Sequence, residues 1–130
     1  MNIVGVDLGG TNIKAALVDE SGEISMQKTT KTFANEGTEM ICDRIIELIK
    51  DLAQNEVVKV GIGSPGSIDR ENGVIKYANN ITALNGVKIV QKIKEKTGFD
   101  AYLENDAKAA ALGEKWFGSA KNTENFIVLT

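Results

Sequence analysis

The sequence predicts an α/β domain whose mixed sheet begins with three antiparallel strands and carries helices packed on it. Two apolar, partly β-branched runs, residues 2–8 and 13–18, are separated by the turn Gly-Gly-Thr-Asn, a pattern typical of a β-hairpin. A second turn follows at residues 19–22. The polar alternation of residues 23–33 then indicates a third strand, at the edge of the sheet.

A strand–helix–strand unit comes next. Thr38 is the expected N-cap of a helix that ends near residues 54–55. Its apolar residues recur at helical spacing: Ile41, Ile45, Leu48, Ile49 and Leu52. The run VVKVGIG, residues 57–63, supplies the next buried strand, and a helical crossover makes its pairing parallel.

Shorter elements and loops make up the rest of the chain. In order, we expect a polar loop at 64–73, a strand at 74–78, a loop at 79–86, a helix at 88–97 closed by Gly98, a strand at 101–104, a helix that begins at Asn105-Asp106, and a strand at 126–129. Because the chain stops on that last apolar strand, we expect it to be a fragment of a longer protein.

Composition excludes several classes of function. The net charge of −3 and the pI near 5.0 give no electrostatic case for binding nucleic acid. One cysteine forms no internal disulfide, and no run suits a leader peptide or a membrane span, so we expect a cytoplasmic protein. These residues contain no histidine, which excludes a Ser-His-Asp triad and a histidine-ligated metal within them.

The first turn carries more polar groups than a hairpin needs. Gly9 and Gly10 let backbone N–H groups converge on an anion, while Thr11 adds a hydroxyl and Lys14 a positive charge. Asp7 is suited to hold a hydrated Mg²⁺ that bridges to phosphates. A tight turn in which the aspartate accepts hydrogen bonds from turn amides is an equal alternative.

The run GIGSPG matches the Gly-x-Gly-x-x-Gly spacing of dinucleotide-binding folds, but we reject that interpretation. The fingerprint must open a helix, and here turn residues follow. Gly66 more reasonably shapes a rigid loop that offers Ser64 and backbone groups to a small polar ligand. A purely structural loop has comparable weight.

Asn105 and Asp106 lie where a strand meets a helix, the place at which ligand-facing side chains collect in open α/β sheets. Asp106 is explained fully as a helix N-cap. Its functional interpretation is a general base that takes a proton from a sugar hydroxyl. Asn105 would then pair with adjacent hydroxyls.

Four segments together, VGVDLGGTNIKAALVD, GIGSPGSID, YANNI and LENDAKAAALGE, resemble the amino-terminal lobe of ROK-family sugar kinases. The resemblance runs from Asn2 to Thr130 with the motifs in order. It implies a ribonuclease H-like, actin-like ATPase lobe with ATP and Mg²⁺ as cofactors. It also implies that the first turn is a phosphate loop, with Gly9, Gly10 and Thr11 near the ATP phosphates and Asp7 near Mg²⁺.

The same resemblance implies roles in sugar binding and catalysis. Asn105 would bind sugar hydroxyls, and Asp106 would be the catalytic base. Gly66 and Asn80 match loop positions that contact the sugar. Asn79 stands where a proline is common in the family, so the loop around Asn80 departs from the usual pattern.

The resemblance implies a glucokinase-like, ATP-dependent hexose kinase that acts in carbohydrate metabolism, in glycolysis. It also implies that the carboxyl-terminal lobe lies beyond residues 1–130. We expect a homo-oligomer, a dimer in full length, and an isolated chain that is inactive and self-associates. The sugar stays open. The alternatives are a sugar-responsive regulator of the same family, disfavoured by the acidic balance, and a non-catalytic sugar-binding module.

Overall fold

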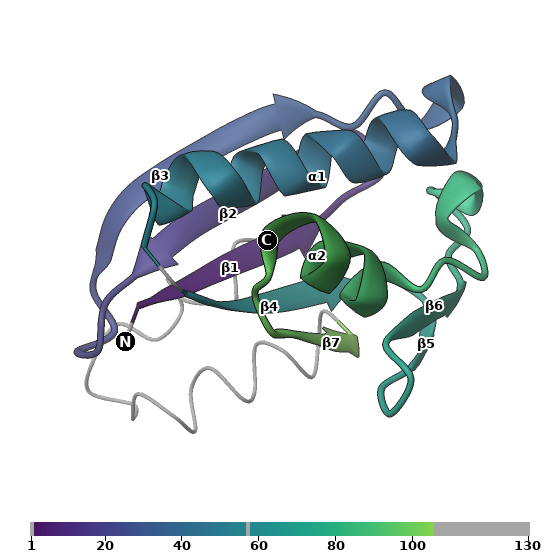
Figure 1. Ribbon diagram of the computed structural model, residues 1–130. Helices are drawn as coiled ribbons and strands as arrows, with labels where there is room; N and C mark the ends of the chain where they lie inside the picture. The colour runs from purple at the N-terminus through teal and green to yellow at the C-terminus, as the bar shows by residue number, and fades with distance from the viewer. Residues whose placement is uncertain (1, 57, 106–130) are drawn as a thin grey trace.

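A computed structural model describes residues 2–56 and 58–105. Its main sheet has five strands in the order β3-β2-β1-β4-β7 (Figure 1). The strands are β1 (Ile3–Leu8), β2 (Asn12–Val18), β3 (Ile24–Lys31), β4 (Lys59–Ser64) and β7 (Ala101–Asn105). The first three pair antiparallel, whereas β4 lies parallel to both β1 and β7. The predicted mixed sheet is confirmed.

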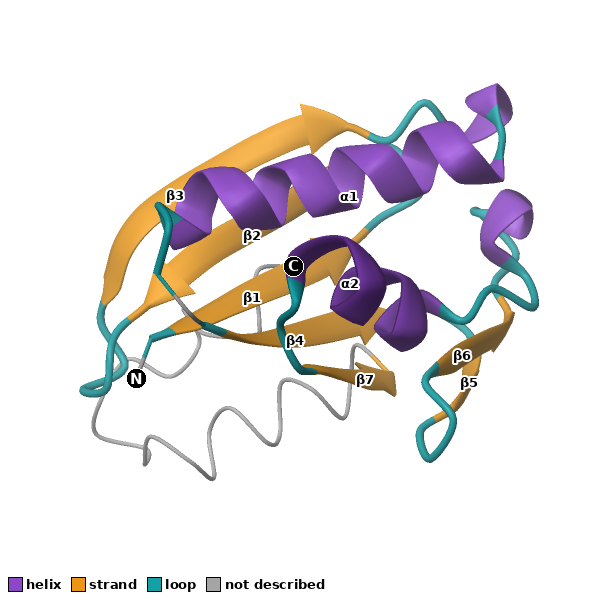
Figure 2. Cartoon of the chain, viewed as in Figure 1, coloured by secondary structure: helices purple, strands orange, loops and turns teal. Residues whose placement is uncertain are grey.

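Two helices pack on one face of this sheet, as Figure 2 shows. Helix α1 (Thr38–Ala53) contacts β1, β2 and β3, and the shorter α2 (Ile89–Thr97) contacts β7 and α1. All five apolar residues expected on the inner side of α1 are buried. On β1 the inner side holds Val4, Val6 and Leu8, because alternate strand residues face the same way. The hydrophobic core therefore lies between the sheet and the helices.

A small two-stranded sheet lies beyond the carboxyl ends of the parallel strands (Figure 1). It consists of β5 (Ser67–Asp69) and β6 (Val74–Tyr77), paired antiparallel, and β5 contacts β7. Residues 64–73 were expected to be a loop throughout, so β5 corrects that prediction. The hairpin forms because the turn between its strands is rich in turn residues, and Asn72 donates two hydrogen bonds to Asp69, which lower the pKa of that carboxyl.

The start of α1 also differs from the prediction. Gly37 is the N-cap, and Thr38 is already the first helical residue. The Thr38 hydroxyl donates to the carbonyl oxygen of Ala83 at 2.6 Å instead of to its own helix. It thereby ties α1 to the 3-10 turn η2 (Thr82–Leu84), whereas the other 3-10 turn, η1 (Ala34–Glu36), directly precedes Gly37.

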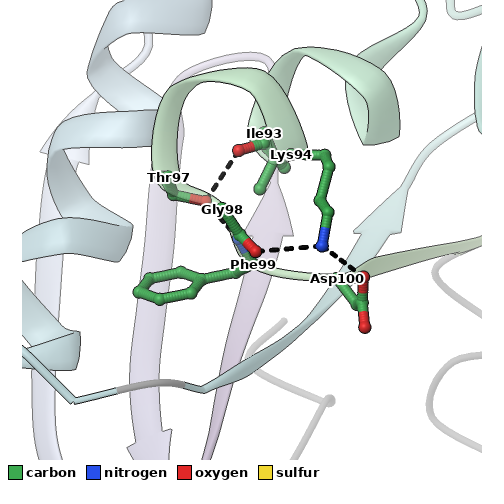
Figure 3. A network of polar contacts seen from close by, with 6 residues as sticks. All are labelled: Ile93, Lys94, Thr97, Gly98, Phe99 and Asp100. Carbon is green, nitrogen blue, oxygen red and sulfur yellow. Dashed lines mark hydrogen bonds and ion pairs between the residues drawn. The ribbon is translucent and has the colours of Figure 1, made fainter.

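Helix α2 ends at Gly98, as predicted, with a network of polar contacts (Figure 3). The Gly98 N–H donates to the Lys94 carbonyl at 2.9 Å, and the Thr97 hydroxyl donates to the Ile93 carbonyl at 2.6 Å. The Lys94 ammonium pairs with Asp100 at 3.0 Å. This network lies at the amino end of β7, opposite the edge at which the parallel strands end.

None of the helices in the described part of the chain has the length and apolar character needed to span a membrane.

Cys42 on α1 provides a test of the core. The residue is buried, and burial raises the pKa of its thiol. Burial blocks access of reagents to the sulfur, and the raised pKa lowers the fraction of reactive thiolate. We therefore expect alkylation by iodoacetamide at pH 8 to be at least about 100-fold slower in the native protein than in urea. Mass spectrometry of the Cys42 peptide measures the rate.

The matched control is a cysteine introduced at the exposed position Glu47 of the same helix, Glu47→Cys, which should react at close to the unfolded rate. Equal rates at Cys42 and at the introduced cysteine in the native protein would contradict the packing of α1 described here.

Candidate functional site

Three parallel strands, β1, β4 and β7, end at one edge of the sheet. Their register places Asp7 of β1 beside Gly63 of β4, and Ser64 of β4 beside Asn105 of β7. Loops that leave the carboxyl ends of parallel strands form the ligand site in open α/β sheets. The three segments singled out in the sequence therefore meet at this edge.

The turn after β1 is closed by its own backbone. The Gly9 N–H donates to the Asn12 carbonyl at 3.0 Å. A Cβ on Gly9 would lie only 2.6 Å from that carbonyl oxygen, so the turn has no room for a side chain there. Compact glycine turns of this kind let backbone N–H groups approach an anion closely.

Gly10 brings this turn against the loop that contains Asn80. A Cβ on Gly10 would lie 2.8 Å from the Asn80 Cβ and 3.2 Å from its carbonyl oxygen. Asn80 itself is exposed. Its loop is held by Asn85, whose side-chain oxygen accepts the Ala78 N–H at 2.7 Å. The first turn and the YANNI segment, separated by about 70 residues in the sequence, are thus in direct contact.

Gly66 brings the second loop against β6. Its φ of +84° is in the left-handed region, and a Cβ at this position would overlap the Tyr77 carbonyl oxygen. Only glycine satisfies both conditions. The sequence GIGSPG therefore enters a strand and not a helix, in agreement with our rejection of the dinucleotide fingerprint.

Asn105 joins the third segment to the second. Its side-chain Nδ2 donates to the Gly66 carbonyl at 2.9 Å. This bond spans 39 positions of the sequence and fixes the amide at the end of β7. Ser64, in contrast, is buried, and its hydroxyl donates a hydrogen bond to the Pro65 carbonyl at 3.1 Å. This hydroxyl therefore stabilises the loop itself.

Glu104 is a site neighbour that sequence reasoning missed. This buried carboxylate accepts the Asn105 N–H at 3.0 Å and pairs with the Arg70 guanidinium at 3.0 Å. It connects the β5–β6 hairpin to the end of β7 and holds the backbone of Asn105. A charged residue in an otherwise apolar strand, next to a proposed ligand residue, was the signal that could have identified it.

Asp7 and Lys14 face each other across β1 and β2 in the register of the hairpin. Asp7 is half-buried at the end of its strand, whereas Lys14 is exposed. No cluster of three acidic, cysteine or histidine ligands occurs within residues 2–56 and 58–105. Mg²⁺ that accompanies a nucleotide often uses one or two carboxylates and the phosphates themselves, so Asp7 and the glycine turn together fit a metal–phosphate group.

Asp106, the predicted catalytic base, lies outside the described residues. The described chain reaches Asn105, whose backbone ends β7 at the shared edge. The interpretation of Asp106 as a base or as a helix cap therefore stays a prediction.

The strand order, the helices on the sheet and the polar turns at one edge define a lobe of the actin-like ATPase fold, as in the ROK sugar kinases among its structural neighbours. The chain belongs to the ROK family, whose model matches residues 3–130. Both results confirm the resemblance on which the sequence analysis relied.

Individual relatives include kinases and a regulator. A glucokinase of Thermotoga maritima is 41% identical over 131 residues, which cover 100% of this chain and 41% of that protein. A xylose repressor of Caldicellulosiruptor bescii is 31% identical over 139 residues, which cover 99% of this chain and 34% of that protein. Among solved structures, a ROK family glucokinase from Streptomyces griseus in complex with glucose and AMPPNP superimposes with a TM-score of 0.80 at 33% identity, covering 94% of this chain and 38% of that one.

The chain spans about two fifths of the length of the glucokinases it matches.

Gly66 gives a direct test of the second loop. In Gly66→Ala, the new methyl group meets the Tyr77 carbonyl in a backbone conformation that already disfavours a side chain. We expect the free energy of unfolding to fall by about 3 kcal/mol or more. Urea denaturation followed by circular dichroism measures it.

Gly86→Ala is the matched control. Gly86 has a similar φ of +79°, but a Cβ there would meet no atom within 4 Å. It should lose only about 1–2 kcal/mol from backbone strain. Equal losses in both variants would show that the contact between the second loop and β6 is absent.

Proposed function

We propose that this chain is the amino-terminal, sugar-binding lobe of an ATP-dependent hexose kinase. In this proposal the first turn binds the phosphates of ATP, and the loops around Gly66 and Asn80 bind the sugar together with Asn105. The full-length protein would supply the rest of the cleft through a second lobe. Glucose is the leading substrate because glucokinases are prominent among the relatives.

One observation carries the proposal: the tight contact between Gly10 and Asn80. It joins the turn assigned to phosphate with a loop assigned to sugar. Transfer of a phosphoryl group requires the donor and the acceptor hydroxyl to be held side by side, because positioning and charge stabilisation supply most of the catalysis. The contact between these two loops supports the proposal, because it would place the phosphate and sugar subsites next to each other.

Asp106 completes the chemistry in this proposal. Its carboxylate would take the proton of the acceptor hydroxyl while that oxygen attacks the γ-phosphorus and ADP leaves. Asn105, held by Gly66 and Glu104, would orient the neighbouring hydroxyls. Asp7 and the glycine turn would hold Mg²⁺ and the phosphates, and the metal would neutralise phosphate charge when bound.

A regulator is the second candidate, because the xylose repressor matches almost all of this chain. The same lobe would then bind a sugar as a signal without phosphorylating it. Gel-shift assays with the full-length protein and its promoter DNA, combined with the turnover measurements below, separate the two functions.

The first test is a panel of sugars with the full-length protein and ATP. We expect release of ADP with glucose or with one of N-acetylmannosamine, fructose, allose and a β-glucoside. The panel settles the substrate because a single hydroxyl contact changes discrimination strongly. A coupled assay for ADP measures the rate. Sugar binding with no ADP release from any of the five would contradict the kinase.

The second test removes the proposed base in the full-length protein. Asp106→Ala should lower kcat by about 10²–10⁴-fold, because a general base contributes on this order. The KM for the sugar should change much less. Initial rates at saturating ATP give both values.

Asp100→Ala is the matched control. It removes an exposed carboxylate at the other end of β7, where Asp100 pairs with Lys94 (Figure 3). It should leave kcat within about twofold of the parent protein. If Asp106→Ala also kept kcat within a fewfold of the parent protein, Asp106 would not be the general base.

A further inference from the structure

Thr32 stands out among the buried residues because its surroundings tie it to the first turn. It lies just after β3 and is fully buried, and the described part of the chain buries only two other polar or charged residues, Ser64 and Glu104. Both of those lie at the carboxyl ends of β4 and β7, at the edge already described. Sequence analysis gave Thr32 no role.

The backbone and the side chain of Thr32 both bind the turn. The hydroxyl donates to the Gly9 carbonyl at 2.7 Å, and the Thr32 N–H donates to the Thr11 carbonyl at 2.8 Å. With the internal bond from Gly9 to Asn12, three carbonyl oxygens of the turn accept hydrogen bonds from the protein itself. These contacts determine which way the peptide groups of the turn face.

The direction of the Gly9–Gly10 peptide follows from its planarity. In a trans peptide, the C=O of one residue and the N–H of the next point in opposite directions. Because the Gly9 carbonyl points to the Thr32 hydroxyl, the Gly10 N–H points away from Thr32. An N–H held outward in a glycine turn is a donor for an anion, whereas an outward carbonyl would repel one.

Thr32 is in turn held by α1. The Arg44 guanidinium donates to the Thr32 carbonyl at 2.9 Å, forms an ion pair with Glu36 and lies 4.9 Å from the centre of the Phe33 ring. A chain of contacts therefore runs from the packed helix through Thr32 to the turn.

We infer that Thr32 is a positioning residue for nucleotide phosphate: its hydroxyl fixes the Gly9–Gly10 peptide in the orientation that binds the anion. The inference rests on the proposed assignment of this turn to ATP. It goes beyond that assignment because Thr32 is fully buried and would act through the Gly9 carbonyl, without contacting the nucleotide.

The test compares Thr32→Val with Thr32→Ser in the full-length protein. Valine keeps the shape and loses the hydroxyl, whereas serine keeps the hydroxyl. We expect Thr32→Val to raise the Kd for MgADP about 10-fold in calorimetry, since the hydrogen bond that orients the partly buried Gly9 carbonyl is lost. Thr32→Ser should stay within about twofold to threefold, and the KM for the best sugar of the panel should change less than twofold in either variant.

Thr97→Val is the matched control, because the Thr97 hydroxyl also donates to a backbone carbonyl but at the opposite edge of the sheet (Figure 3). It should leave the Kd for MgADP unchanged. Thermal melts of all variants confirm that binding is measured on folded protein. If Thr32→Val does not fold, Arg44→Met gives a second route: it removes the donor to the Thr32 carbonyl and should weaken MgADP binding about twofold to fivefold.

The outcomes separate the inference from the proposed function. Unchanged MgADP binding in Thr32→Val, or an equal loss of sugar and nucleotide binding, would overturn the inference even if the protein is an active kinase. A parent protein that binds MgADP but phosphorylates no sugar would contradict the kinase and still allow the comparison of affinities. A parent protein that binds no MgADP would overturn both.

Discussion

The parallel pairing of β4 with β1 on one side and β7 on the other is the constraint on which the site depends. It places the strand ends Leu8, Ser64 and Asn105 on one edge of the sheet. In the sequence, about 55 residues separate Leu8 from Ser64, and about 40 separate Ser64 from Asn105. Antiparallel pairing of any one of these strands would send its loop to the far edge. Helix α1, with its continuous buried side, is the crossover that makes the first parallel pairing possible.

Once the strand ends share an edge, close backbone contacts join their loops. Two contacts have no space for a side chain: Gly10 against Asn80, and Gly66 against Tyr77. A third is the hydrogen bond from Asn105 to Gly66. These close contacts add to the anchoring of the Asn80 loop by Ala78 and Ile81, which are buried in the main hydrophobic core. This is the kind of rigidity that a binding site built on loops requires.

The elements of the sheet could be predicted because each had a local signal. The hairpin turn, the helical spacing from Ile41 to Leu52 and the glycine after α2 all depend on residues close together in the sequence. The strand β5 was missed because three residues among turn formers give no periodicity. Thr38 was misassigned because its hydroxyl bonds to Ala83, a residue that no local rule connects with it.

The same distinction explains what was found of the site. Glycines, Asn80 and Asn105 were selected from motifs, and the structure brings them together. Thr32 and Glu104 were missed because the partners that give them their roles are distant in the sequence. Thr32 binds Gly9, about 23 positions away, and Glu104 pairs with Arg70, about 34 positions away. The charge of Glu104 within an apolar strand was a signal for that residue, whereas nothing in a buried threonine distinguishes support of a neighbouring loop from ordinary packing until the partner is known.

The remaining question is which described group, if any, could act as a base in place of Asp106. Glu104 is a poor choice, because its two oxygens are engaged by the Asn105 N–H and by Arg70. Asp7 lies on β1, in register with Lys14 and beside the turn that suits phosphate, so its charge is better placed for a metal than for a hydroxyl proton. The described edge thus offers amides, hydroxyls and backbone donors that suit binding. In the proposed kinase, the step from binding to catalysis would depend on Asp106, the residue directly after Asn105 in the sequence.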